Sequence, residues 1–379
     1  MMKLAIFNEY ILFIFKQAPS YTVQTIYEGV LFMKISNGVK IAAVYGSVFL
    51  GAGFASGQEL LQYFVSFGSI GLLGILVAGF LFAMVGYATL KICVNAGINN
   101  YSQLMVHLLG KRMGPIMEGL VAGFLFCLFV AMLAGAGATG REAFNIPFTF
   151  GAILVSIIVF FILCFGLKGI VKINIILAPF MLLGGIFIGL LTFFTYTTPV
   201  FSSFLGGRFA FAWLLSAVVY ASYNLVTAVP ILTATSSLVE KKKDGVVGGI
   251  LGGGVITILG ICMALPLFLY YSNVVNLEIP FLHIVFGYGT ALRFLYLGVL
   301  GSALLTTAAC NAFAVLEWLK SRGFNNKIKT AGVICLTGVA AAHIGFSNIV
   351  IFVYPLFGFL GLFKIVVILF GGFWYNEKD

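Results

Sequence analysis

Gly51, Ala52 and Gly53 form a run of small residues just before Phe54, inside an otherwise apolar part of the chain. A glycine costs about 1 kcal/mol relative to alanine in a helix interior, and unpaired backbone groups are expensive in lipid. We therefore expect the helix to break here and to leave backbone amides uncovered, close to a half-helix that begins near Ala55. A helix start favours an anion, so the predicted ligand is a solute carboxylate. The alternative is that these residues only allow close helix packing.

A second apolar run contains the polar stretch YASYN at residues 220–224, followed by Pro230. It lies in the second half of the chain, at a position that corresponds to the first glycine-rich stretch. Matching defects in the two halves favour two broken helices over simple packing.

Glu59 is an acidic residue two positions past Gly57, and ionisable residues inside membrane spans are functional candidates. Three functional interpretations of Glu59 are open: its carboxylate senses the amino group of the solute, forms an outer gate, or takes up a proton. The alternative is that it caps the half-helix, whose positive dipole end stabilises a carboxylate. Glu118 and Glu317 are expected to pair with Lys or Arg, and Lys364 either snorkels or pairs with an inner glutamate.

The composition defines the class of protein. Of 379 residues, 61% are hydrophobic and 8% are charged, whereas soluble domains have about 25% charged residues. The chain is thus predicted to be an all-α polytopic membrane protein. Its net charge of +10 comes from short basic clusters between apolar runs, which argues against nucleic-acid binding. The six cysteines have no paired spacing, so neither a disulfide nor a metal site is expected.

Ten apolar segments are long enough to span a bilayer. An even split gives five spans per half, so the second half enters the membrane from the opposite face, as in an inverted repeat. We expect repeat A at 38–195 and repeat B at 211–374, with helices 1 and 6 discontinuous. The predicted spans are 40–65, 69–94, 114–138, 148–166, 170–195, 211–238, 246–271, 289–317, 329–346 and 348–373. An amphipathic surface helix is expected at 98–112.

The orientation follows from the basic residues between the spans. Nearly all lie on the side where the first span begins, while Arg141, Arg208 and Arg293 fall on the other side. Because cytoplasmic loops are enriched in Lys and Arg, both termini are predicted to be cytoplasmic.

Three motifs carry a resemblance to a known family. GAGF at 51–54 resembles the G-S-G-I signature in helix 1 of the amino acid–polyamine–organocation superfamily. YASYN at 220–224 resembles the helix 6 signature of that superfamily, Y-x-G-F-E. GLKGIVKIN at 166–174 resembles its entry into helix 5. The start MKISNGVKIAAVYGSVFLGAGFASGQE (33–59) looks like that of YkvI-like bacterial membrane proteins. The resemblance covers about residues 33–375 and implies a LeuT-like fold in a bacterial cytoplasmic membrane.

The resemblance also implies a solute site. Backbone groups at Gly51, Ala52 and Gly53 would meet a solute carboxylate, with Phe54 beside them. The opposite wall would be formed by backbone and side chains of helix 6, where Ser222 replaces the family's glycine and Asn224 its glutamate. The helix 6 residues implied are Tyr220, Ser222, Tyr223 and Asn224.

Sodium-coupled relatives bind the ion between helix 1 carbonyls and a hydroxyl pair on helix 8. Thr306 and Thr307 match that pair, Ser47 and Leu50 would supply the helix 1 carbonyls, and Ala303 would supply a third. The alternative is that the two threonines bond to carbonyls of their own helix. Proton-coupled relatives carry a helix 5 lysine, which LAPFMLLGG (177–185) lacks. Na⁺ is therefore the expected coupling ion, with no other metal and no cofactor.

The predicted function is sodium-coupled symport of a small carboxylate-bearing solute, such as an amino acid, by alternating access. The alternative is a nutrient-sensing receptor subunit on the same scaffold. Motifs typical of membrane hydrolases and proteases are missing from the sequence, which disfavours an enzyme. The expected partners are the solute and the lipid bilayer, and the sequence defines neither the solute nor the oligomeric state.

Residues 1–32 fit neither the ten-helix plan nor the resemblance, so we expect a single transmembrane domain at 33–375. Their apolar run, Tyr10–Phe15, is too short to span. We expect translation to start at Met33, where the resemblance begins. The alternative is an interfacial anchor helix.

Overall fold

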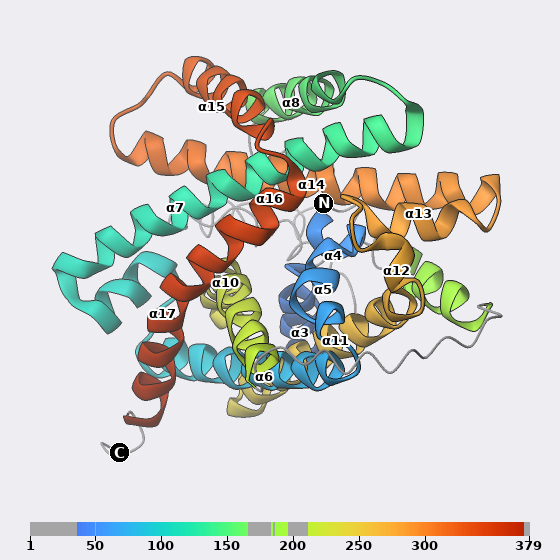
Figure 1. Ribbon diagram of the computed structural model, residues 1–379. Coiled ribbons are helices and arrows are strands. Elements are labelled where there is room, and N and C mark those ends of the chain that lie inside the picture. Colours follow the sequence, from blue (N-terminus) through green and yellow to red (C-terminus); the bar gives the residue numbers. More distant parts are fainter. Residues whose placement is uncertain (1–35, 50, 166–182, 185, 196–210, 375–379) are drawn as a thin grey trace, which may run out of the picture.

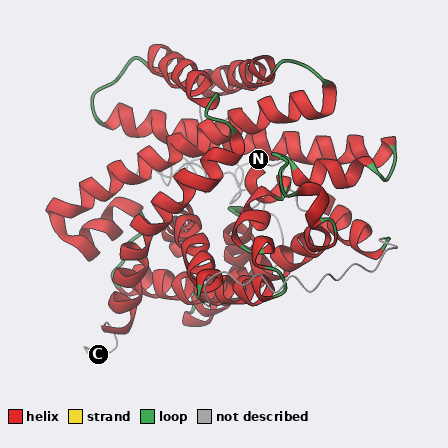
Figure 2. Cartoon of the chain, in the orientation of Figure 1, coloured by secondary structure: helices red, strands yellow, loops and turns green. Residues whose placement is uncertain are grey.

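The computed structural model describes residues 36–374 apart from 50, 166–182, 185 and 196–210. The described chain folds into helices joined by loops and turns (Figure 1, Figure 2). Within it, seven helices are long and apolar enough to cross a membrane. Residues 1–32 and most of the predicted span at 170–195 lie outside the described residues.

The first predicted span is divided among three short helices. They are α3 (Asn37–Ser47), α4 (Ala52–Ser56) and α5 (Gln58–Tyr63). The chain is extended at Gly51, and at Gly57 its φ is +82°, in the left-handed region where glycine is favoured. The half-helix expected from about Ala55 begins at Ala52, three residues earlier, and a second segment begins at Gln58.

The next helices are long. They are α6 (Ile70–Asn95), α7 (Tyr101–Phe144) and α8 (Phe148–Phe165). The Asn100 side chain accepts a hydrogen bond from the Gln103 N–H and caps α7. Helical geometry stops at Gly110, where φ is +77°, so the part before it corresponds to the amphipathic helix expected at 98–112.

The second half begins with α10 (Ala212–Thr235), which is one continuous helix. The predicted discontinuity of helix 6 at residues 220–224 is therefore wrong. The local residues explain it, because the Asn224 side-chain amide donates to the Tyr220 carbonyl of the same helix, 3.0 Å away, and the stretch contains no glycine. Such local bonds satisfy polar groups without unwinding the backbone.

The remaining helices complete the bundle. The elements in chain order are α11 (Lys242–Leu269), α12 (Tyr271–Val274), α13 (Pro280–Phe286), α14 (Thr290–Ser321), α15 (Lys327–Ala342), α16 (Phe346–Asn348), the π-helical turn η3 (Ile349–Val353) and α17 (Tyr354–Trp374). At 16 residues, α15 is shorter than the predicted span at 329–346. The ten-span count and the 5+5 repeat stay predictions.

Glycines of α11 allow it to pack closely against α6. A Cβ atom built on Gly249 of α11 would lie 2.5 Å from the Tyr87 amide nitrogen of α6, and one built on Gly253 would lie 2.6 Å from the Ala83 nitrogen. The two backbones therefore touch at these positions. In Figure 1, the short helices α3, α4 and α5 lie between this α6–α11 layer and α14.

Candidate functional site

The turn between α4 and α5 places the Glu59 carboxylate against Gly53. A Cβ atom built on Gly53 would lie 1.8 Å from Glu59 Oε1, so the carboxyl group occupies the volume that any other residue at position 53 would fill. Glu59 itself is buried. The left-handed backbone at Gly57 turns the chain so that α5 folds back beside α4.

The helix α10 holds the other side of this carboxyl group. Tyr223 donates a hydrogen bond from its hydroxyl to Glu59 Oε2, at 2.7 Å. Glu59 thus connects α5, on which it lies, with both α4 and α10.

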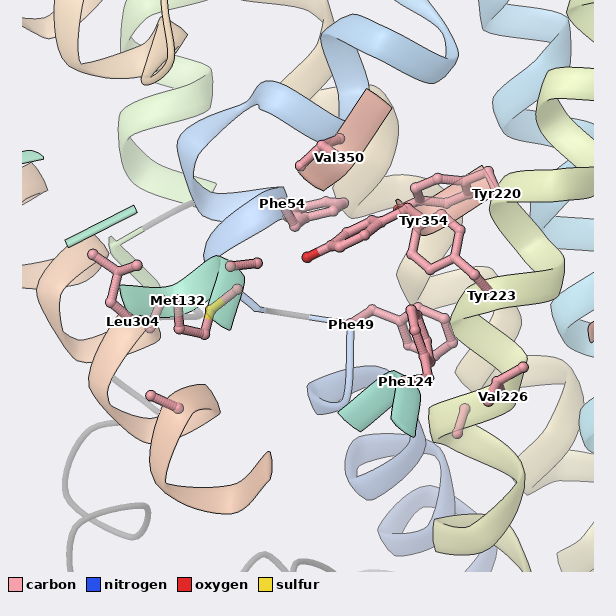
Figure 3. Close-up of a cluster of buried hydrophobic side chains, with 14 of the residues drawn as sticks. Phe49, Phe54, Phe124, Met132, Tyr220, Tyr223, Val226, Leu304, Val350 and Tyr354 are labelled. Atoms are coloured by element: carbon pink, nitrogen blue, oxygen red, sulfur yellow. The ribbon is translucent and has the colours of Figure 1, made fainter. Parts of the chain in front are cut away.

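Four tyrosines surround the carboxyl group. Tyr63 and Tyr223 have ring centroids 5.4 Å apart, Tyr220 lies 5.4 Å from Tyr223, and Tyr354 lies 4.9 Å from Tyr223. Phe54 of α4 is buried, and Figure 3 draws it in the same cluster as Tyr220, Tyr223 and Tyr354. The arrangement is a packed aromatic cluster that encloses one acidic group.

Two buried polar atoms in these elements have no hydrogen-bond partner. One is Oε1 of Gln58, whose Nε2 donates to Ser347 Oγ at 3.2 Å, and the other is the hydroxyl of Tyr354. Buried polar groups are nearly always paired, so each can accept or donate to a ligand.

The predicted solute-binding residues on α10 divide into two pairs. Tyr220 and Tyr223 face α5, because the ring centroid of Tyr63 lies 5.5 Å from that of Tyr220 and 5.4 Å from that of Tyr223. Ser222 faces α17, because its hydroxyl donates to the Gly358 carbonyl, and Asn224 bonds to its own helix. The structure therefore places the aromatic pair beside Glu59, whereas the Ser222 and Asn224 side chains bond to Gly358 and Tyr220.

The predicted sodium ligands come together only in part. A Cβ atom built on Gly51 would lie 3.7 Å from Thr307 Oγ1, so the start of α4 lies beside the hydroxyl pair of α14. Thr306 Oγ1 donates to the carbonyls of Ser302, at 2.8 Å, and Ala303, at 3.3 Å, as in the alternative reading. Ser47 is the last residue of α3, and Leu50 lies outside the described residues.

The sequence did not point to Tyr63, Tyr354 or Ser347 as part of the site. Tyr63 was open to detection, because it follows Glu59 by four residues and lies on the same face of α5. Tyr354 and Ser347 reach the site through long-range packing, for which the local sequence carries no signal.

Two other charged residues for which the sequence predicted an ion pair or a surface position are Glu317 and Lys364. Glu317 pairs with Lys320 at 3.8 Å, in line with the prediction for it. Lys364 is 2% exposed, and its Nζ donates to the Val226 carbonyl at 3.3 Å and lies 4.6 Å from the Tyr101 ring centroid. It therefore neither snorkels to the surface nor has a glutamate as its hydrogen-bond partner.

Comparison with solved structures identifies the class of fold to which this chain belongs. Three solved structures have the same overall arrangement. A Na⁺-coupled sialic acid symporter in a substrate-bound outward-open state matches with a TM-score of 0.60 and 13% identity, over 93% of this chain and 84% of that chain. The manganese transporter of Eremococcus coleocola matches with a TM-score of 0.61 and 14% identity, over 89% and 80% of the two chains, and MhsT in complex with L-phenylalanine with a TM-score of 0.61 and 18% identity, over 88% of each chain. The fold is therefore that of a LeuT-type membrane protein.

Sequence comparison then gives the particular relatives. The chain is homologous to the uncharacterized membrane protein YkvI of Bacillus subtilis (strain 168), with 25% identity over 329 residues, which are 85% of this chain and 92% of YkvI. The uncharacterized protein YyaD of the same organism is 25% identical over 326 residues, 86% of this chain and 94% of YyaD. No family model matches the chain. The YkvI-like resemblance predicted from residues 33–59 is thus confirmed.

Proposed function

We propose that the protein is a secondary active transporter that moves a small carboxylate-bearing solute, such as an amino acid, by alternating access. The observation that carries the proposal is the aromatic cluster around the buried carboxyl group of Glu59, with the two unpartnered polar atoms of Gln58 and Tyr354. The described neighbours support it, since they include a Na⁺-coupled sialic acid symporter and a structure of MhsT with L-phenylalanine.

The solute binds at the start of α4. The backbone amides of Gly51, Ala52 and Gly53 meet its carboxylate, while Phe54, Tyr220 and Tyr223 contact its side chain. Ser222 and Asn224 contribute through their backbone, because their side chains bond to Gly358 and Tyr220.

Sodium is the proposed coupling ion, held by carbonyls of Ser47, Leu50 and Ala303 and by the hydroxyls of Thr306 and Thr307. The contact between Gly51 and Thr307 supports this placement, because it brings the interrupted first span next to the hydroxyl pair. Oxygen ligands without a full carboxylate suit a monovalent cation that must leave again.

The proposed architecture has ten spans in a 5+5 inverted repeat, with the first span discontinuous. The protein lies in a bacterial cytoplasmic membrane with both termini in the cytoplasm.

Uptake into proteoliposomes tests the proposal. Purified protein is reconstituted and supplied with a panel of radiolabelled amino acids, with and without an inward sodium gradient, and protein-free liposomes serve as the control. With equal pH on both sides of the membrane, we expect one or more panel members to accumulate with the sodium gradient and not without it. Saturable binding without accumulation would instead support the receptor alternative, in which the same scaffold senses a nutrient.

A further inference from the structure

Glu59 is the one buried acidic residue in the described chain. The ion pairs among the described residues are Arg141 with Glu278 and Glu317 with Lys320, so Glu59 belongs to neither. Its hydrogen-bond donor is the uncharged hydroxyl of Tyr223. Its negative charge, if present, has no countercharge there.

Among the described elements packed around α5, none pairs a cation with Glu59. Both α4 and η3, and the turn at Val65–Phe67, contain no ionisable residue, and α11 has only Cys262 between residues 245 and 269. The titratable groups that face Glu59 are tyrosines: Tyr63 on α5, Tyr220 and Tyr223 on α10, and Tyr354 on α17.

Lys364 is the other buried charged residue among those that the structure describes, and it also bonds to α10. Its ammonium donates to the Val226 carbonyl, one helical turn from Tyr223, rather than to Glu59. The two charges are therefore anchored separately, and Lys364 does not neutralise the carboxylate by direct contact.

An unpaired carboxylate in a dry interior carries a large desolvation cost, and binding a proton removes that cost. Glu59 also lies against Gly53, where the proposed solute carboxylate docks. Two carboxylates that share a site repel each other, and a proton on one of them relieves the repulsion. Proton binding and anion binding at this place are thus mutually favourable, which is the thermodynamic condition for coupling.

We propose that Glu59 is a proton-binding site that is loaded together with the anionic solute. A proton from water on the outer side forms the O–H bond of the carboxylic acid, and that bond breaks on the cytoplasmic side, where the proton returns to water as the solute leaves. The inference rests on the proposed transport of a carboxylate, and it makes the proton a driving ion at a site separate from the threonine pair.

Infrared difference spectroscopy tests the site without any solute. The full-length protein in phosphatidylethanolamine and phosphatidylglycerol bilayers is compared between acidic and alkaline buffer. We expect the carbonyl-stretching band of a buried carboxylic acid to disappear on alkalinisation in wild type and to be absent from Glu59→Gln. Glu317→Gln, which removes a carboxylate paired with Lys320, should keep the band. Glu59→Asp, which retains a carboxyl group, should shift it. Identical difference spectra for wild type and Glu59→Gln would overturn the proposal.

Transport provides a second readout. With sodium equal on both sides, an acidic exterior should drive accumulation of labelled amino acids from the panel, and Glu59→Gln should lower this accumulation on the order of 10-fold. If the infrared band is present but wild type accumulates nothing, the transport proposal fails and the proton site stands. If wild type accumulates solute but Glu59→Gln responds to the pH gradient as wild type does, the proton site fails and transport stands.

Discussion

At the scale of single residues, the site depends on how closely Glu59 and Gly53 approach each other. The sequence pointed to both residues, because glycines and an acid are conspicuous in an apolar run. It did not predict that one fills the space beside the other, since that contact needs the left-handed turn at Gly57 and the hydroxyl of Tyr223 on another helix.

Replacing Gly53 with alanine should displace the carboxyl group. The new Cβ atom would overlap Glu59 Oε1, so the side chain must leave Tyr223, and losing a hydrogen bond to such a group costs about 1–3 kcal/mol. We expect a lower thermal midpoint and loss of solute binding in a folded, monodisperse protein. Gly51→Ala is the matched control, because its Cβ atom would make ordinary contact with Thr307, and it should unfold close to wild type.

The hydroxyl of Tyr223 should matter more than that of Tyr63. Tyr223→Phe leaves Glu59 Oε2 without its donor and should destabilise the protein by about 1–3 kcal/mol. Tyr63→Phe removes a long hydrogen bond, 3.5 Å to the Val350 carbonyl, so a smaller loss is expected. Thermal unfolding followed by tryptophan fluorescence measures both, and equal losses would contradict the assigned geometry.

At the scale of helices, α10 departs most from what its sequence predicted. Pro230 has no N–H, so the Val226 carbonyl four residues earlier lacks its helical donor. Lys364 of α17 supplies one at 3.3 Å. This contact between distant segments, together with the local bond of Asn224, lets α10 continue where polar residues and a proline predicted a break. Local patterns cannot reveal such a donor, because it comes from another helix.

A double-mutant cycle tests this pairing of Lys364 with Pro230. Lys364→Met should destabilise the protein by about 1–3 kcal/mol, because the Val226 carbonyl becomes unpaired. Pro230→Ala restores the missing N–H, so adding it to Lys364→Met should recover part of that loss, with a coupling energy of about 0.5–3 kcal/mol. Strictly additive effects in thermal unfolding would mean that the lysine does not act through this carbonyl.

The contact between α4 and α14 gives the two threonines of α14 different neighbours. Thr307 lies beside Gly51, whereas the Thr306 hydroxyl bonds to its own helix. We expect Thr307→Ala to weaken sodium-dependent uptake more than Thr306→Ala, and the double variant to weaken it most. Losing hydroxyl ligands should cost on the order of 1–3 kcal/mol in sodium affinity. Wild-type uptake that is indifferent to sodium would remove the basis of the prediction before any variant is made.

At the scale of the whole molecule, the LeuT-type fold was predicted from the family resemblance of the motifs at 51–54, 166–174 and 220–224, whereas composition alone was sufficient to predict a polytopic membrane protein. That prediction succeeded because span length and apolar content are set by the bilayer and are visible locally. The arrangement of spans is less accessible, since α15 is short, and the first span is split among three helices.

Cysteine labelling tests the predicted orientation. In a variant whose six cysteines are replaced by serine, Asn325→Cys lies between α14 and α15, and Thr149→Cys lies at the start of α8. Both positions are exposed. A membrane-impermeant maleimide should modify position 149 in intact cells and position 325 only after permeabilisation. The reverse pattern would place the termini outside.

The backbone contact between α6 and α11 also bears on how this chain can diverge. Positions 249 and 253 have no room for a side chain. Any larger residue there would meet backbone atoms of α6, so the main chain would have to shift, because no change of rotamer could relieve the overlap. Apolar residues around them can exchange for one another with local repacking. Among related sequences these two glycines should therefore drift far more slowly than their larger neighbours, and a scan of random variants should find almost no tolerated substitution there.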